Sequence, residues 1–210
     1  MLTFLGILVA VWIVDWTIVF KVWPDGIDRL RSILAADLAR GRALAAWQGG
    51  VPGVVTETAN SLYAIVFRFT GIHDMGMRFA EGAAHSIPDT IVRNTYLANI
   101  EGIEVAMIGT QLLGVRIATL ALLAPILVLI YIVAGADGLT QRAIRRASGG
   151  RESASLYHRA KHLQVALMAT GLLICLFWPG SVDVRWIGLP LAATLAILTR
   201  LQWAYYKKHL

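Results

Sequence analysis

Four long stretches of the chain are almost purely apolar, and the segments between them carry most of the charged residues. The stretches cover residues 2–22, 117–135, 163–178 and 186–203. A membrane-spanning helix needs about 20 predominantly apolar residues. The apolar pattern of the second stretch already begins near Val105, so its helix is expected to start there. The sequence therefore predicts an all-α, polytopic membrane protein with four transmembrane helices in a single integral membrane domain, residues 1–210.

Two of these stretches have alternative interpretations. The third is short for a membrane helix, at about 24 Å. Either the side chain of Lys161 snorkels to the interface and lengthens it, or the stretch is a buried helix of a soluble domain. We favour a membrane helix because the fourth stretch needs an antiparallel neighbour. The first stretch lacks the basic start and the small-residue cleavage site of a signal peptide, and Trp23-Pro24 follows it. We interpret it as a retained anchor.

Composition agrees with a membrane protein. Hydrophobic residues make up 57% of the chain and charged residues 15%, whereas soluble domains have about 45–50% and about 25%. These values exclude an ordinary soluble globule and a disordered chain. The one cysteine, Cys175, excludes an intrachain disulfide and a cysteine-based zinc site.

The charges of the connecting segments predict the orientation. Residues 24–104 carry seven basic and nine acidic side chains, whereas residues 136–162 carry six basic and two acidic ones. Cytoplasmic connections of membrane proteins are enriched in Lys and Arg. We therefore expect both termini and the basic loop 136–162 to be cytoplasmic, and the long segment 24–104 to lie outside.

The outer segment has the pattern of helices rather than of a linker. Apolar residues recur at helical spacing before a break at residues 48–53. A second helix is predicted for residues 56–70 and a third from Asp74 to about Ala84, followed by a turn at residues 86–89. This arrangement predicts an extracytoplasmic helical cap between the first and second transmembrane helices. Its apolar faces are expected to pack against each other, although lipid contact and a partner groove are alternatives.

No familiar catalytic motif occurs in the sequence. The phosphate-binding loop, the H-E-x-x-H zinc motif and the G-x-S-x-G nucleophile motif are all absent. Glu101 and Glu104 are interpreted as solvated acids at a helix start. His158 and His162 are spaced for one helix face, but the neighbouring cations Arg159 and Lys161 repel a metal ion. We therefore expect no enzyme, cofactor or metal site.

The most specific motifs of the sequence lie in the basic loop, residues 136–162. Residues 137–146 read DGLTQRAIRR, residues 150–153 read GRES and residues 157–161 read YHRAK. These motifs resemble those of the integrating conjugative element membrane protein family. Further similarities are Asp15-Trp16 with Trp23-Pro24 and the Lys207-Lys208 ending. The resemblance implies an inner-membrane accessory subunit of a conjugative type IV secretion apparatus, associated with the coupling ATPase that delivers DNA.

The basic loop is accordingly the predicted partner-binding site, although anionic lipid is an alternative partner. Direct DNA binding by the loop is a weaker option, because Tyr157 is the one aromatic residue of the loop and bases need aromatic side chains on which to stack. The second transmembrane helix either ends at Gly138 or continues through Arg142, Arg145 and Arg146, whose spacing gives it a basic face. The candidate residues for partner binding are Asp137, Arg142, Arg145, Arg146, Arg151, Glu152, Tyr157, His158, Arg159 and Lys161.

Two sets of residues inside the membrane helices are candidates for structural contacts. Small residues that repeat every four positions permit close helix packing, either within the chain or with another subunit. Asp15 and Arg116 are predicted to form an intramembrane ion pair, because a charge in hydrocarbon needs a partner. A transporter or membrane enzyme with such a polar site is the alternative function. The small residues are Ala106, Thr110, Gly114, Ala118, Ala192 and Ala196.

Overall fold

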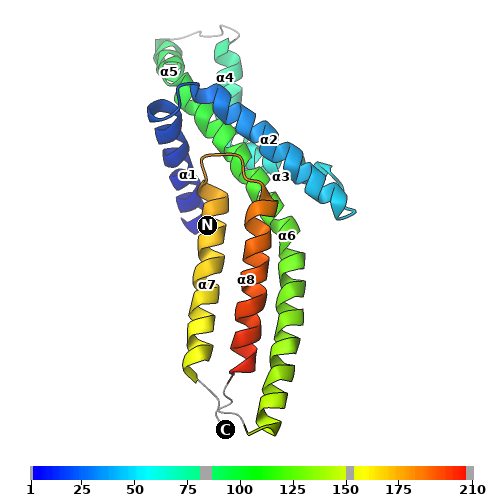
Figure 1. Cartoon of the computed structure of the whole chain (residues 1–210). Helices are drawn as coiled ribbons and strands as arrows, with labels where there is room; N and C mark the ends of the chain where they lie inside the picture. The colour runs from blue at the N-terminus through cyan, green and yellow to red at the C-terminus, as the bar shows by residue number, and fades with distance from the viewer. Residues whose placement is uncertain (1, 81–86, 150–153, 207–210) are drawn as a thin grey trace. The chain divides into compact units, whose positions relative to one another are not determined.

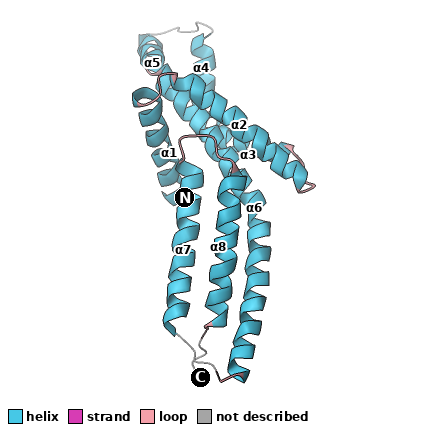
Figure 2. Ribbon diagram, in the orientation of Figure 1, coloured by secondary structure: helices cyan, strands magenta, loops and turns pink. Residues whose placement is uncertain are grey.

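The computed structural model describes residues 2–80, 87–149 and 154–206, and every regular element within these ranges is a helix (Figures 1 and 2). Four of the helices are long and apolar enough to cross a membrane: α1, α6, α7 and α8. This confirms the prediction of an all-α chain with four candidate membrane spans. The elements are α1 (Leu2–Lys21), α2 (Gly26–Trp47), α3 (Gly53–Tyr63), the π-helix η1 (Ala64–Arg68), α4 (Ile72–Ala80), α5 (Ile87–Ala98), α6 (Ile100–Ala147), α7 (Ala154–Phe177) and α8 (Val184–Ala204).

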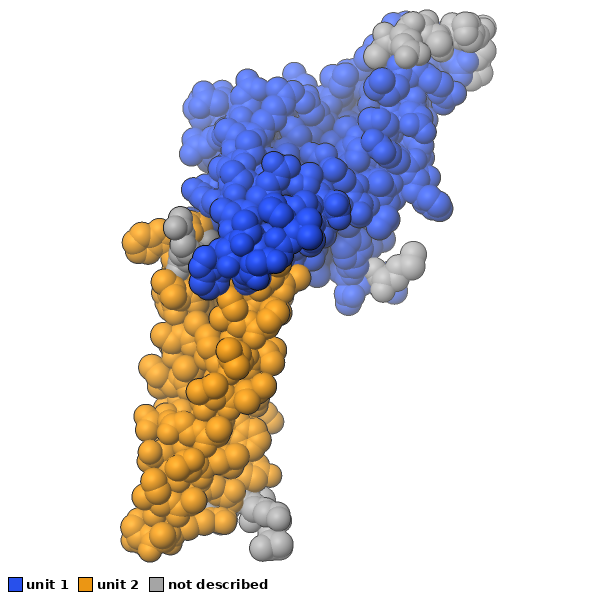
Figure 3. All heavy atoms as spheres, turned by 90° about the vertical axis from the view of Figure 1, so that its right-hand side faces the viewer, with its two compact units in different colours: residues 1–119, 176–182 blue, residues 120–175, 183–210 orange. Residues whose placement is uncertain are grey.

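The chain forms two compact units, which Figure 3 shows in different colours. The first contains residues 1–119 together with the short segment 176–182 that links α7 to α8. The second contains residues 120–175 and 183–210. Helix α6 contributes its N-terminal part to the first unit and its C-terminal part to the second.

The first unit is built around a cluster of aliphatic side chains from α1, α2 and α6. Val19, Leu30 and Val105 are each at most 2% exposed, and they pack with the remaining members Ile33, Ile108 and Leu112. Burying such side chains contributes roughly 1.5–3 kcal/mol each. The apolar face of α2 thus supplies much of the core that orders the long segment after α1.

Helix α3 packs closely against α2, and glycine makes this approach possible. A Cβ atom on Gly41 would lie 2.9 Å from Cγ1 of Val55, which is fully buried. The turn between the two helices contains Gly49 at φ +72°, a left-handed conformation that favours glycine. The predicted break at residues 48–53 is therefore confirmed as a helical hairpin.

Two predictions for this segment need correction, and a third is only partly covered by the described residues. The second predicted helix is divided into α3 and η1, and the chain turns at Gly71, whose φ is +77°. Helix α4 is described as far as Ala80, so the predicted continuation to Ala84 lies outside the described residues. The turn expected at residues 86–89 is wrong from Ile87 onward, because α5 begins there. Pro88 falls in the first turn of α5, where proline is tolerated because the missing N–H needs no helical partner.

In the second unit, α6 continues well beyond its apolar stretch. The predicted helix end at Gly138 is wrong, and the alternative of a continuing helix with a basic end is confirmed by the described span to Ala147. Gly138 is instead a close-packing residue. A Cβ atom there would lie 2.6 Å from the carbonyl oxygen of Arg200 and 2.8 Å from Cβ of Trp203. Because glycine has no Cβ atom, α8 can lie directly against α6 at this position.

Candidate functional site

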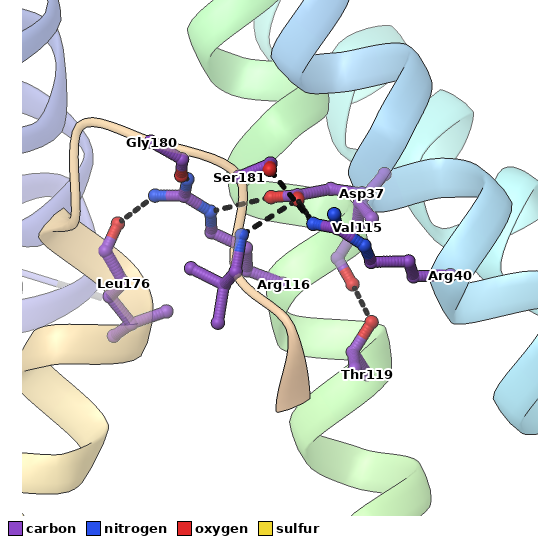
Figure 4. A network of polar contacts seen from close by, with 9 residues as sticks. Asp37, Arg40, Val115, Arg116, Thr119, Leu176, Gly180 and Ser181 are labelled. Carbon is purple, nitrogen blue, oxygen red and sulfur yellow. Dashed lines mark hydrogen bonds and ion pairs between the residues drawn. The ribbon is translucent and has the colours of Figure 1, made fainter. Parts of the chain in front are cut away.

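Arg116 occupies the centre of a buried polar cluster in the first unit (Figure 4). Its side chain, 6% exposed, projects from α6 and pairs through Nε with Oδ2 of Asp37 on α2, at 3.3 Å. Nη1 donates to the carbonyl oxygen of Leu176 at 3.0 Å, and Nη2 donates to that of Gly180 at 2.8 Å. All three guanidinium nitrogens therefore have a partner, as a buried cation requires.

Asp37 completes the cluster from the other side. Its Oδ1 accepts a hydrogen bond from the backbone N–H of Val182 at 2.9 Å, and Arg40 lies 3.8 Å away. Arg40 also donates to Oγ of Ser181 at 2.8 Å. Burial raises the pKa of Asp37 above its usual range, and the charge of Arg116 opposes that rise.

This cluster acts as a clasp rather than as a binding site. It joins α2, α6 and the segment 176–182, and each guanidinium nitrogen of Arg116 is paired with a group of the chain itself. The connection after α1 and the connection between α7 and α8 therefore lie together. In a membrane protein, such contact requires both connections to be on the same side of the bilayer.

The predicted ion pair between Asp15 and Arg116 is not formed, because Arg116 pairs with Asp37 instead. Asp15 is buried in α1 against Gly109, and its Oδ2 has no hydrogen-bond partner among the described residues. Gly109 precedes Arg116 by seven residues, a rise of roughly 10 Å along α6. The register of α1 against α6 thus separates the two side chains.

The small residues of α6 are used in packing within the chain. Thr110 is fully buried and accepts a hydrogen bond from Nε1 of Trp12 at 2.9 Å. A Cβ atom on Gly114 would lie 2.7 Å from Cα of Ala59, so α3 approaches α6 closely. Ala118 is also buried and Ala106 is half-buried. The remaining members of the predicted set, Ala192 and Ala196 on α8, are half-buried in the second unit.

Two arginines of the predicted basic site are held by tyrosines at the end of α8. The guanidinium carbon of Arg145 lies 3.8 Å from the ring centroid of Tyr205, and Nη1 donates to the carbonyl oxygen of Ala204 at 3.1 Å. The guanidinium carbon of Arg142 lies 5.3 Å from the centroid of Tyr206. Such cation–π contacts are worth about 0.5–2 kcal/mol. These arginines stabilise the end of the bundle, and both are half-buried.

The other predicted partner-binding residues differ in their contacts and in their exposure. Asp137 forms an ion pair with Arg200, and the ring of Tyr157 lies 5.5 Å from that of Tyr206. Arg151 and Glu152 lie outside the described residues. The exposed side chains are those of Arg146, His158, Arg159 and Lys161.

The candidate metal groups do not assemble into a site. His158 and His162 are both exposed on α7, and no group of three potential metal ligands gathers within the described ranges. Glu104 pairs with Arg31 rather than remaining only solvated, and Glu101 is exposed. The described residues of the two units therefore contain no candidate metal centre with three ligands.

The contacts of Asp37, Tyr205 and Tyr206 were not predicted from the sequence. A signal for Asp37 was available: it lies four residues after Ile33 and eight before Ala45, in register with the buried face of α2. The tyrosines carried no comparable signal, because their contacts depend on where α8 ends relative to α6.

These features describe a helical protein with four helices long and apolar enough to cross a membrane, a clasped first unit and a basic, tyrosine-supported end in the second. Residues 29–207 match the model of the DtrJ-like family, described as IncC plasmid conjugative DNA transfer protein DtrJ-like. The chain belongs to this family, and the resemblance to conjugation proteins is thereby confirmed. Neither the curated proteins nor the solved structures contain a match to the chain.

Proposed function

We propose that this protein is a non-enzymatic accessory subunit of a conjugative type IV secretion apparatus in the bacterial inner membrane, and that it associates with the coupling ATPase. Membership of a conjugative DNA transfer family carries the proposal. The four candidate membrane helices agree with a subunit that is embedded in the bilayer. The use of all three Arg116 guanidinium nitrogens by the chain favours a scaffold over a transporter with an open polar site.

For the topology, we propose that both termini and the loop 136–162 are cytoplasmic and that residues 24–104 form an extracytoplasmic cap. The charge difference between the two connections supports this orientation. The clasp agrees with the four-crossing arrangement but not with one orientation over the other, because α2 contacts the segment 176–182 through Asp37 and Arg40. A four-crossing chain places these two connections on one side.

The docking surface is proposed to be the exposed basic start of α7, the first turns of the helix, which carry Arg159 and Lys161. Both side chains are exposed, whereas Arg142 and Arg145 are held by the C-terminal tyrosines. A basic surface at the cytoplasmic face fits an acidic protein surface, and bidentate carboxylate contacts favour arginine.

Purification from donor cells in mild detergent tests the association. The tagged protein is expected to bring down the coupling ATPase, together with other conjugation-machinery membrane subunits, at moderate salt. Retention of other membrane subunits with consistent loss of the ATPase contradicts the proposed partner. The wild-type chain from cells that lack the conjugative element is the control for non-specific capture.

A further inference from the structure

An open apolar groove runs between α6 and α8 in the second unit. Its aliphatic lining residues are Leu129, Ile130, Val133, Ala134, Ala196 and Ile197. The remaining lining residues are Asp137 and Arg200, which form an ion pair with each other. The groove therefore has a long apolar part and a polar end that carries one positive and one negative charge.

The polar end lies where lipid headgroups are expected. Arg200 precedes Trp203 by three residues, about 4.5 Å along α8, and two tyrosines follow. Tryptophan and tyrosine concentrate at the membrane–water interface. Leu129 precedes Asp137 by eight residues, about 12 Å along α6. A molecule that follows the groove from its polar end thus passes from headgroup depth into hydrocarbon.

Both members of the ion pair remain accessible to a ligand. The side chains of Asp137 and Arg200 are 47% and 51% exposed, and Leu129 and Ile197 in the apolar part are 61% and 58% exposed. A guanidinium binds phosphate, and a carboxylate accepts hydrogen bonds from an ammonium group. The pair thus complements a headgroup that contains both charges.

We propose that this groove binds one phospholipid whose headgroup joins a phosphate to a primary ammonium, as in phosphatidylethanolamine. The phosphate contacts Arg200, the ammonium donates to Asp137, and an acyl chain lies along the aliphatic residues. A quaternary choline headgroup has no N–H to donate, and a purely anionic headgroup meets the repulsion of Asp137. The inference does not depend on the proposed docking to the ATPase.

Native mass spectrometry of the full chain in mild detergent tests the proposal. The probes are phosphatidylethanolamine, its N-methyl and N,N-dimethyl derivatives and phosphatidylcholine, all with the same acyl chains. We expect retention to fall by about five-fold over the series and mainly at the last methylation, because the dimethyl headgroup still has one N–H to donate and choline has none. Equal retention of the ethanolamine and choline lipids overturns the proposal.

Two variants and a control locate the binding. Asp137→Asn is expected to abolish the preference for the primary ammonium, and Arg200→Gln to weaken retention of every lipid in the series. Arg78→Gln removes an exposed cation from α4, outside the groove lining, and is expected to leave the retention of every lipid unchanged. Phosphatidylglycerol with the same acyl chains is the anionic probe. Its strongest retention, or a second copy of the chain in place of lipid, contradicts the proposal. The methylation series uses the wild-type chain, so the test stands even where Asp137→Asn does not fold.

Discussion

Arg116 and Asp37 lie 79 positions apart in the sequence and form a buried ion pair, with 3.3 Å between Nε and Oδ2. Two backbone carbonyls and one backbone N–H from residues 176–182 complete their hydrogen bonding. Removing charges from water costs several kcal/mol per ion unless such partners are present. The pair is therefore a joint between three parts of the chain, and its single members are expected to be intolerant of substitution.

Arg116→Leu is expected to lower the free energy of unfolding by about 3–5 kcal/mol, because it leaves Asp37 buried without its counter-ion. The loss is measured as reduced accumulation in membranes and a lower thermal midpoint in mild detergent. Asp37→Leu with Arg116→Leu is expected to recover part of this loss, since no unpaired charge remains. Arg78→Leu, an exposed arginine of α4, is the control. A double variant no more stable than Arg116→Leu alone contradicts the account.

Close helix contacts at glycine predict a second class of sensitive positions. Gly138→Ala and Gly114→Ala each place a methyl group less than 3.0 Å from backbone or Cβ atoms of a neighbouring helix. Such overpacking typically costs about 1–3 kcal/mol. Gly6→Ala in α1 is the matched control, because no atom lies within 4 Å of its added Cβ. Thermal midpoints in detergent are expected to fall for the first two variants alone, and equal midpoints for all three argue against the packing described here.

The sequence was sufficient for the elements whose pattern is local. The four apolar helices and the break after α2 follow from long apolar runs and from a glycine-rich turn. Helix α5 was missed because Ser86, Pro88 and Asp89 together are typical of a turn. The same residue types are also typical of a helix start, and only the structure distinguishes these possibilities at Pro88.

Long-range register could not be predicted in the same way. Asp15 and Arg116 are both isolated polar residues in apolar runs, and pairing them assumed a particular vertical alignment of α1 and α6. In the structure Asp15 lies against Gly109. The partner of Arg116 comes from α2, a helix whose place against α6 is set by Leu30, Ile33 and the close approach at Gly41. Packing of this kind is not visible in a single sequence.

The stacking of Arg145 on Tyr205 predicts a difference between arginine and lysine. Arg145→Lys retains the charge but loses the planar guanidinium and its hydrogen bond to Ala204, so a stability loss of about 0.5–2 kcal/mol is expected. Arg159→Lys on the exposed face of α7 is expected to leave the thermal midpoint unchanged. Equal midpoints for the two variants contradict a structural role for Arg145.

Cysteine labelling in intact cells tests the proposed topology. Gly50→Cys in the turn after α2 is expected to react with a membrane-impermeant maleimide, whereas Gly149→Cys after α6 is expected to react only in opened cells. Both positions are exposed glycines in turns, so each is a control for the accessibility of the other. The reverse pattern contradicts the orientation assigned from the loop charges.

Co-purification of the coupling ATPase with an α7 charge-reversal variant tests the central claim most directly. Arg159→Glu with Lys161→Glu reverses the two exposed cations, and Arg68→Glu with Arg78→Glu makes the same charge change at exposed residues of η1 and α4. The first variant is expected to insert normally, to lose the ATPase and to reduce DNA transfer between cells by at least about ten-fold, the effect of losing about 1.4 kcal/mol of binding. The second variant is expected to retain both activities. Undiminished ATPase recovery and transfer with the α7 variant would contradict the account.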